Sequence, residues 1–477
     1  MTPSPPSRSL RDWLAILCIG VGTAVVPLDS ATNIAFPDIT ESFAIEIVQI
    51  QWVVIAYGLT FTSLTLLGGR LGDRYGRRLI FGVGAVWNTL AFIGLTLAPT
   101  FPLFLAARFA QGVGAALVLS CGPALITSLA DEDRRARMLG LYMLMFGVAQ
   151  TLGPSIGGAV VEAFGWPGVY AMRLPLCLLA LLLLWALPGR KQQAKWKSGM
   201  ALNVPGGLML AVAVATVLFA INRLQVPATQ AWIPAGLAIA AAALIRAFVR
   251  HEARSPAPIL PLGLFRRRDF TGMAGANGLV AFSGFAVMLI APYFLLRLTQ
   301  LDVTVAGVVL ATSPLGIAVS SARAGWLIEK LGARRTAALA AASTAIGLVG
   351  VGLWPPSPGL FLMIVPLFLT GTGLGLFQVA SMDVITGTMS LAERGVAGSL
   401  TMVTRTFGVI AGASLLSLAF ATLGGGSDAT DDAFLHAFRW IFLAAAIPPA
   451  LVAIAMLGAR DRTAQTVPSG DPKPSLR

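Results

Sequence analysis

Long apolar stretches repeat along the whole chain, separated by short segments rich in glycine, proline or charge. Each stretch is long enough to cross a bilayer as a helix, which takes roughly 20 mostly apolar residues. Strands are not expected, because the stretches lack period-2 alternation and most exceed the ~10 residues of a membrane barrel strand. The pattern predicts fourteen helices, at residues 13–35, 48–69, 79–98, 102–129, 138–162, 168–188, 204–222, 231–250, 271–296, 303–323, 336–354, 358–384, 396–422 and 434–458.

A charged loop motif occurs twice within this pattern. Gly68-Gly-Arg-Leu-Gly-Asp-Arg-Tyr-Gly-Arg-Arg78 follows the second predicted helix, and Gly325-Trp-Leu-Ile-Glu-Lys-Leu-Gly-Ala-Arg-Arg335 follows the tenth. The triplet Phe146-Gly-Val recurs as Phe407-Gly-Val in the fifth and thirteenth helices. These repeats predict two six-helix halves with the seventh and eighth helices inserted between them. Two halves around a midplane site are typical of alternating-access transporters.

The predicted fold is an all-α polytopic membrane protein. Its predicted segments are a disordered cytoplasmic N-terminus at 1–12, a six-helix bundle at 13–188, a linker with the two inserted helices at 189–270, a second six-helix bundle at 271–458 and a disordered cytoplasmic tail at 459–477. Most of the 34 Lys and Arg residues fall in alternate connecting segments, on the side that holds both termini. Because basic residues favour cytoplasmic loops, this skew predicts that both termini are cytoplasmic and that the number of spans is even.

The composition excludes several classes of protein. Hydrophobic residues make up 56% of the chain and charged residues only 12%, about half the charge of a soluble domain. A water-soluble enzyme, a disordered chain and a nucleic-acid binder are therefore excluded, although the net charge is +13. The lipid bilayer is the expected environment, and the frequent Ala, Gly and Arg residues fit a bacterial inner membrane.

Metal and ATP chemistry are not expected either. The three cysteines, Cys18, Cys121 and Cys177, lie in apolar runs and are interpreted as buried hydrophobic residues. The two histidines, His251 and His436, are too few and too far apart for a metal site. The chain also lacks the phosphate-binding loop of ATP-driven pumps. We therefore expect no metal and no catalytic residue, and a protein that is not an enzyme.

Five segments resemble motifs of one known family. Residues 68–78 resemble the loop signature of the major facilitator superfamily, and 107–114 are similar to its helix-4 arginine motif. Residues 147–158 resemble the helix-5 motif typical of its antiporters. Residues 28–37 and 254–270 resemble the helix-1 motif and the linker of the fourteen-helix drug:proton antiporter subfamily, the multidrug efflux type. The resemblance implies proton-driven export of a small molecule by rocker-switch alternating access, which underlies antibiotic resistance. It also implies no cofactor beyond the proton gradient, and a chain that acts as a monomer with protons, substrate and lipid as its partners.

Three positions depart from the family pattern. The sixth helix reads Ala171-Met-Arg173-Leu-Pro175 where Phe-x-x-Asn-x-Pro is usual, and Asp29-Ser-Ala-Thr stands where Asp-x-Thr is usual. Glu329 occupies the place that Asp73 has in the first half. These departures bear on the substrate more than on the fold.

Asp29 is the central candidate for proton coupling, because an ionisable side chain inside a span is expensive and usually functional. Asp29 and Arg108 each lie about five or six residues below the outer ends of their helices, a depth of roughly 8–9 Å, so they are expected to pair or to interact across a cavity. Burial favours the neutral acid, whereas Arg108 favours the carboxylate. That competition suits a proton carrier. The alternatives are a static salt bridge, a hydrated Asp29, or an Arg108 that only ties helices together.

Two further motifs predict moving parts. Asp73 is expected to cap the third helix and to form a cytoplasmic gate with neighbouring basic and glycine residues; the alternative is a loop that only sets topology. The gate residues are Gly68, Gly72, Asp73, Arg74, Gly76, Arg77 and Arg78. The antiporter motif, with small residues four apart and a helix-bending proline, is expected to form a seam between the halves; the alternative is static packing. Its residues are Gly147, Gly153, Pro154, Gly157 and Gly158.

Polar and aromatic residues within the spans are candidates for a substrate cavity. They are Asn33, Tyr57, Gln111, Gln150, Asn277, Phe282, Gln378 and Arg405. Arg173 is expected to reach the outer membrane surface, and Asp383 to lie at a helix end. The charged residues expected deep within the spans are then one acid, Asp29, and two bases, Arg108 and Arg405. Lipophilic substrates that are neutral, monocationic or anionic are therefore favoured over dications. An uptake symporter or facilitator of the same fold and a non-transporting membrane scaffold remain alternative functions.

Overall fold

The protein is described by a computed structural model. It describes residues 10–128, 135–186, 203–223, 232–255, 258, 263, 266–387, 394–426 and 428–458. The predicted tail at 459–477 and residues 1–9 of the predicted N-terminal segment lie outside the described residues. Among those that are described, all regular structure is helical, as the sequence predicts.

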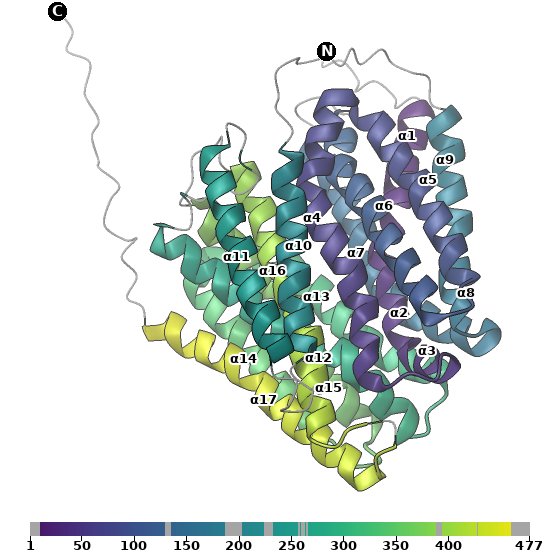
Figure 1. The fold of residues 1–477 in the computed structure, drawn as a ribbon, viewed down its shortest axis with the longest axis vertical. Helices are drawn as coiled ribbons and strands as arrows, with labels where there is room; N and C mark the ends of the chain where they lie inside the picture. The colour runs from purple at the N-terminus through teal and green to yellow at the C-terminus, as the bar shows by residue number, and fades with distance from the viewer. Residues whose placement is uncertain are drawn as a thin grey trace, which may run out of the picture.

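The helices fall into three groups along the chain (Figure 1). The first group is α1 (Leu10–Ala24), η1 (Pro27–Ser30), α2 (Ala31–Ile34), α3 (Phe36–Ser42), η2 (Ile47–Ile50), α4 (Gln51–Tyr75), α5 (Arg77–Thr96), α6 (Phe101–Ser128), α7 (Arg135–Phe164), α8 (Trp166–Ala171) and α9 (Leu174–Ala186). The inserted pair is α10 (Val204–Asn222) and α11 (Trp232–Arg254). The last group is α12 (Arg268–Arg297), α13 (Val303–Leu331), α14 (Ala333–Gly352), α15 (Leu360–Gly387), α16 (Arg394–Thr422) and α17 (Asp431–Gly458).

Thirteen helical segments of the described chain are long and apolar enough to cross a membrane. The predicted span at 204–222 forms α10, whose apolar stretch, Pro205–Val217, is shorter than the others. A multi-pass membrane protein is therefore confirmed, whereas the count of fourteen spans is not. Large apolar side chains on the outer helix faces, such as Leu90, Phe361 and Ile454, are exposed, as lipid contact requires.

Two predicted helices are interrupted, and here the prediction of continuous helices is wrong. The first breaks into α1, η1 and α2, because Pro27 stands at the start of η1 and cannot donate a backbone hydrogen bond to the preceding turn. The sixth breaks into α8 and α9 around Met172 and Arg173, shortly before Pro175. Asp29 lies in the first break and Arg173 in the second, so both charged residues lie where the backbone departs from a regular helix.

The loop motif repeats in three dimensions. Gly76 ends α4 with a φ of +100°, and Gly332 ends α13 with a φ of +82°. Residues with a side chain rarely adopt such positive φ values, so a glycine in the motif is required for the turn into the next helix. Asp73 lies in the last turn of α4, before this break. The expectation that Asp73 caps the third helix is therefore wrong.

The charges define two ends of the bundle, here called the basic end and the acidic end. The basic end holds Arg74, Arg77, Arg78, Lys330, Arg334 and Arg335. The acidic end holds Asp38, Glu41, Glu46, Asp431 and Asp432. In Figure 1, α1 starts near the top, at the basic end, and α3 lies near the bottom, at the acidic end.

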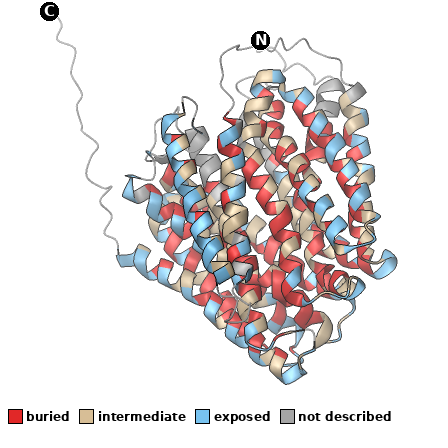
Figure 2. Cartoon of the chain, in the orientation of Figure 1, coloured by how far each residue is buried: buried red, intermediate tan, exposed pale blue. Residues whose placement is uncertain are grey.

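Among the described residues, the large hydrophobic cluster that joins the two halves lies toward the acidic end. There, one cluster joins Ile34, Phe36 and Ile39 of the first half to Ile290 and Phe294 of the second. This group is called the shared cluster below. Toward the basic end, the other large described clusters stay separate, one within α1 and α4–α7 and the other mainly within α12, α14, α15 and α17. The buried residues accordingly concentrate in the lower part of Figure 2.

The inserted helices lie outside both bundles. Helix α10 packs on α11 and also contacts α4 and α16, one from each half (Figure 1). Val214 of α10 packs against a small cluster formed by Ile55 of α4 and Ile410 of α16. The inserted pair therefore flanks one line of contact between the halves, and the contact of α7 with α13 forms another.

Candidate functional site

Asp29 is the centre of a buried polar network between helices of the first half. Its Oδ1 and Oδ2 accept hydrogen bonds from Arg108 Nη1 and Nη2 at 2.8 and 3.0 Å. Arg173 Nη1 donates to the same Oδ1 at 2.9 Å, and Gln111 Nε2 donates at 3.0 Å. The Thr32 hydroxyl adds a bond of 3.2 Å. The predicted pairing of Asp29 with Arg108 is present in the structure.

Arg108 is held by more than its carboxylate partner. Its Nε donates to the Val53 carbonyl at 3.1 Å, and Nη1 also donates to Gln111 Oε1 at 2.6 Å. The guanidinium lies 5.0 Å from the centre of the Tyr57 ring, which stabilises a desolvated cation. Gln111 and Tyr57, predicted to line a cavity, therefore belong to the Asp29 network.

Arg173 is the functional candidate that the sequence places wrongly. The side chain was expected to reach the membrane surface, but it is fully buried and bonded to Asp29. Its Nη2 also donates to the Leu28 carbonyl at 2.8 Å, next to the break in the first helix. The interruptions at residues 25–30 and 172–173 were visible only as prolines in the sequence. No local pattern indicates a pairing across more than a hundred residues.

The network carries two cations and one anion. The two guanidinium side chains are 2% and 0% exposed, whereas the Asp29 side chain keeps 15% of its surface accessible. Of the three charged side chains, the carboxylate is therefore the most exposed. Two cations and an amide stabilise the ionised form of Asp29 in this arrangement. Protonation of Asp29 would require one or both arginines to give up their hydrogen bonds.

The glycine-rich motif at residues 147–158 brings α7 close to helices of both halves. A Cβ atom on Gly157 would lie 2.8 Å from the Cβ of Ala31 in α2. On Gly158 it would lie 2.6 Å from the Val303 carbonyl oxygen at the start of α13, and on Gly307 it would collide with the Pro154 carbonyl. Such approach is possible only for residues without a side chain. Gly153, Pro154, Gly157 and Gly158 thus lie in close contacts, whereas Gly147 has open space around it.

The remaining predicted cavity residues do not form one group. Asn33 is partly buried and donates to the Ser30 carbonyl at 3.2 Å, and Gln150 accepts from Ser30 Oγ at 3.0 Å through its backbone oxygen. Asn277 donates to the Thr401 carbonyl at 2.9 Å and so ties α12 to α16. The side chains of Phe282, Gln378 and Arg405 are partly buried. Asp383 is exposed and lies four residues before the end of α15, as expected for a helix-end residue.

The predicted gate residues lie together at the basic end. Asp73 Oδ1 accepts hydrogen bonds from Arg77 Nε and Nη2 at 3.0 and 2.8 Å, with both side chains nearly half exposed. Arg74 lies 5.4 Å from the ring of Tyr75. Arg78 donates to the Leu184 carbonyl, which ties α5 to α9. Arg70 donates to the Pro258 carbonyl at 2.8 Å, which connects α4 to the segment after the inserted helices.

Two glycines of the gate motif allow α4 to approach α6. A Cβ atom on Gly68 would lie 2.6 Å from Ser120 Oγ, and one on Gly72 would lie 2.7 Å from Cys121 Sγ. Gly76 supplies the turn into α5, as described above. The two hydrogen bonds from Arg77 to Asp73 remain within the first half.

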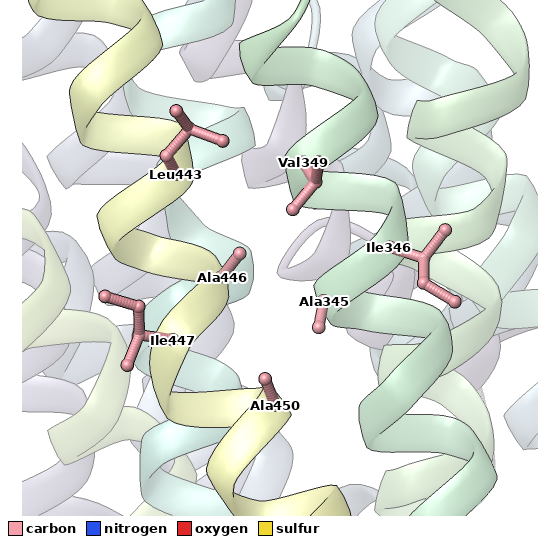
Figure 3. Close-up of a pocket in the computed structure, with 7 residues that line it drawn as sticks. All are labelled: Ala345, Ile346, Val349, Leu443, Ala446, Ile447 and Ala450. Carbon is pink, nitrogen blue, oxygen red and sulfur yellow. The ribbon is translucent and has the colours of Figure 1, made fainter.

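A hollow lies on the membrane-facing surface, between α14 and α17 (Figure 3). Its lining is entirely apolar: Ala345, Ile346, Val349, Leu443, Ala446, Ile447 and Ala450. It offers no polar group that could orient a substrate. In the described part of the chain, no three His, Cys, Asp or Glu residues come together as a metal site would require.

Curated relatives support a transporter. The chain is 28% identical to the riboflavin transporter RibZ of Clostridioides difficile, over 86% of this chain and 89% of the relative. It is 27% identical to the multidrug resistance protein Stp of Mycobacterium tuberculosis strain CDC 1551 / Oshkosh, over 86% and 76%. It is 34% identical to the methylenomycin A resistance protein of Streptomyces coelicolor, over 57% and 56%. These relatives are transporters or resistance proteins, and none is named as an enzyme.

Solved structures and a family model agree on the fold. A mutant of the nucleoside transporter NupG matches with a TM-score of 0.67 at 11% identity, over 94% of this chain and 99% of that chain. A bacterial homolog of the human lysosomal transporter Spinster, solved in an inward-facing and unoccupied conformation, matches with 0.63 at 15% identity, over 94% and 97%. The model of the Major Facilitator Superfamily matches residues 13–270 and 273–476. The chain is therefore a membrane transporter, not an enzyme, and belongs to the major facilitator superfamily.

Proposed function

We propose that the protein is a proton-coupled antiporter that exports a small drug-like or metabolite molecule by alternating access. The observation that carries this proposal is Asp29: one accessible carboxylate held by two buried arginines at interruptions of two helices. A group that binds a proton only when its arginine partners move links protonation to conformation, which is what coupling requires.

The proposed orientation has the basic end in the cytoplasm, in a bacterial inner membrane, with both termini inside. The shared cluster then closes the outer side, and the separate clusters of the two halves lie toward the cytoplasm. This is the inward-facing arrangement, in which Asp29 has released its proton and is bound by Arg108 and Arg173. In the outward-facing state, protonation neutralises Asp29 and weakens its bonds to both arginines. The proton therefore enters from outside and leaves inside as the halves rock.

Two further parts fit this cycle. The close contact of α7 with α13 at Gly158 and Gly307 is the seam that opens when the outer side opens. The pair of Asp73 and Arg77 is accessible at the basic end and is free to change partners when the inner side closes. We propose that the chain acts as a monomer of the fourteen-helix drug:proton antiporter type, driven by the proton gradient without a bound cofactor. The named relatives, a riboflavin transporter and resistance proteins, indicate a small-molecule substrate.

The test is proton movement in vesicles that contain the purified protein and a pH-sensitive dye. Export assays in cells, with and without the gene, first identify a transported compound. The compound is added on one side of the vesicle membrane and crosses to the other side. Protons are expected to move in the opposite direction, because an antiporter exchanges the compound for protons. Proton movement in the same direction as the compound would instead establish the symporter. Transport without any proton movement would establish a facilitator, and no transported compound would favour a scaffold.

A further inference from the structure

Arg405 is a deep cation that has no counter-charge among the described residues. It lies in α16, eleven residues from the start of the helix at Arg394, which places it roughly 16 Å along the helix axis. Its side chain is only partly buried. It forms no hydrogen bond, ion pair or ring contact with any residue that the structure describes. A guanidinium at such depth requires water or a bound acceptor to satisfy its five donors.

The position of Arg405 on α16 is fixed by contacts on two sides. Toward α12, the Thr401 carbonyl accepts from Asn277, and Gly408 meets the backbone of Gly278. Toward α4, Ile410 lies against Gly58. Successive residues of a helix are about 100° apart around its axis, so Arg405 lies on the flank between the face toward α12 and the face toward α4. Because the helix is held on both sides, the backbone of Arg405 has a fixed place where α16 meets α4 of the other half.

The flank that carries Arg405 continues to the shared cluster, where the two halves meet. Val409, one turn along the same face, packs against the shared cluster that closes the acidic end. Arg405 is therefore the next residue of that face toward the basic end, directly beneath the shared cluster. A molecule that enters between the halves from the basic end would reach it there.

The other deep charges do not neutralise Arg405. The Asp29 network already holds two guanidinium groups on one carboxylate and is itself cationic. Glu252 is bonded to Asn203 at the basic end of the inserted helices. Asp383 lies four residues from the end of α15, roughly 10 Å nearer the basic end than Arg405. Among the described side chains that are buried or partly buried deep within the spans, Arg108, Arg173 and Arg405 stand against Asp29, an excess of two positive charges.

We propose that Arg405 binds an anionic group of the transported molecule, so that the substrate is a lipophilic organic anion with a carboxylate. The inference depends on the proposed function in one respect: it takes the space between the halves as the path of the substrate. A carboxylate matches the planar fork of a guanidinium, and it would supply the counter-charge that the protein lacks. A lipophilic dication would meet an excess of positive charge in the same space and is disfavoured.

The test compares two fluorescent probes of one scaffold, 7-(diethylamino)coumarin-3-carboxylate and its neutral carboxamide. Binding to the purified full-length protein in lipid nanodiscs is measured by fluorescence anisotropy, without a proton gradient. The wild type is expected to bind the carboxylate roughly 10- to 100-fold more tightly than the carboxamide, the range for a hydrogen bond between charged groups. Equal affinity, tighter binding of the carboxamide, or no binding of the carboxylate up to its solubility limit would overturn the proposal.

Variants then assign the difference to one side chain. Arg405→Gln is expected to weaken carboxylate binding to the carboxamide level and to leave carboxamide binding unchanged, whereas Arg405→Lys keeps part of the preference. Arg323→Gln, which removes an exposed arginine of α13, is the matched control and keeps the full preference. If Arg405→Gln weakened both probes equally, Arg405 would be a packing residue. The binding result does not depend on proton coupling, so it separates this inference from the antiporter proposal.

Discussion

Replacing Asp29 by Asn is expected to reduce efflux driven by a pH gradient to the level of empty vesicles. The amide has the shape of the carboxyl group but neither ionises nor carries the transported proton. Exchange of labelled for unlabelled substrate across the membrane, which needs no net proton transfer, is expected to continue in this variant. The measurements are gradient-driven efflux and substrate exchange on the same vesicle preparation.

The matched control is Asp383→Asn, because Asp383 is an exposed carboxyl near the end of α15. It is expected to keep gradient-driven efflux. Asp29→Asn leaves two buried guanidinium groups without their anion, so a lower unfolding temperature is expected and substrate exchange serves as the check of folding. Retained pH-gradient-driven efflux in the Asn variant would remove Asp29 from the coupling mechanism.

Replacing Gly158 by Val is expected to lower export by more than tenfold. Even a Cβ atom at position 158 would lie 2.6 Å from the Val303 carbonyl oxygen. This oxygen belongs to the backbone, so it cannot rotate away as a side chain could. The α7–α13 seam then cannot close, and the halves remain apart at the acidic end. Gly147→Val, on the same helix but with open space around it, is the matched control and is expected to transport normally.

Opening of the acidic end can be measured with one introduced cysteine. Ala291 is fully buried in the shared cluster, and the three native cysteines are also buried. In an Ala291→Cys background, a membrane-impermeant maleimide added from the acidic side is expected to react faster when Gly158 is replaced by Val. Equal labelling rates together with normal export would show that the seam does not need this close approach.

Much of the fold could be predicted from the sequence, because a helix that crosses the bilayer needs roughly 20 mostly apolar residues. The two loop motifs also revealed the halves, since a glycine must end α4 and α13 in the same way. The helix interruptions were harder to predict. Pro27 and Pro175 mark them, but a proline inside a span can bend a helix without breaking it.

The candidate site could be predicted only in part. Asp29 and Arg108 stand out because charges inside spans are rare, and their depths from the helix ends agree. Arg173 was expected at the outer membrane surface, because its contact with Asp29 depends on how α8 and α9 pack against η1. Asn277 was expected in a cavity for its polarity, whereas it joins α12 to α16. Polarity indicates that a partner is needed but does not distinguish a substrate from a neighbouring helix.

The most direct test of the account is whether Asp29 takes up the transported proton. Infrared difference spectra of the purified protein in lipid, recorded while the pH is lowered within the range in which the protein stays folded, detect the carbonyl stretch of a protonated carboxylic acid. The wild type is expected to show a band that is missing in Asp29→Asn and remains in Asp383→Asn. Identical spectra of the wild type and Asp29→Asn would contradict proton uptake by Asp29.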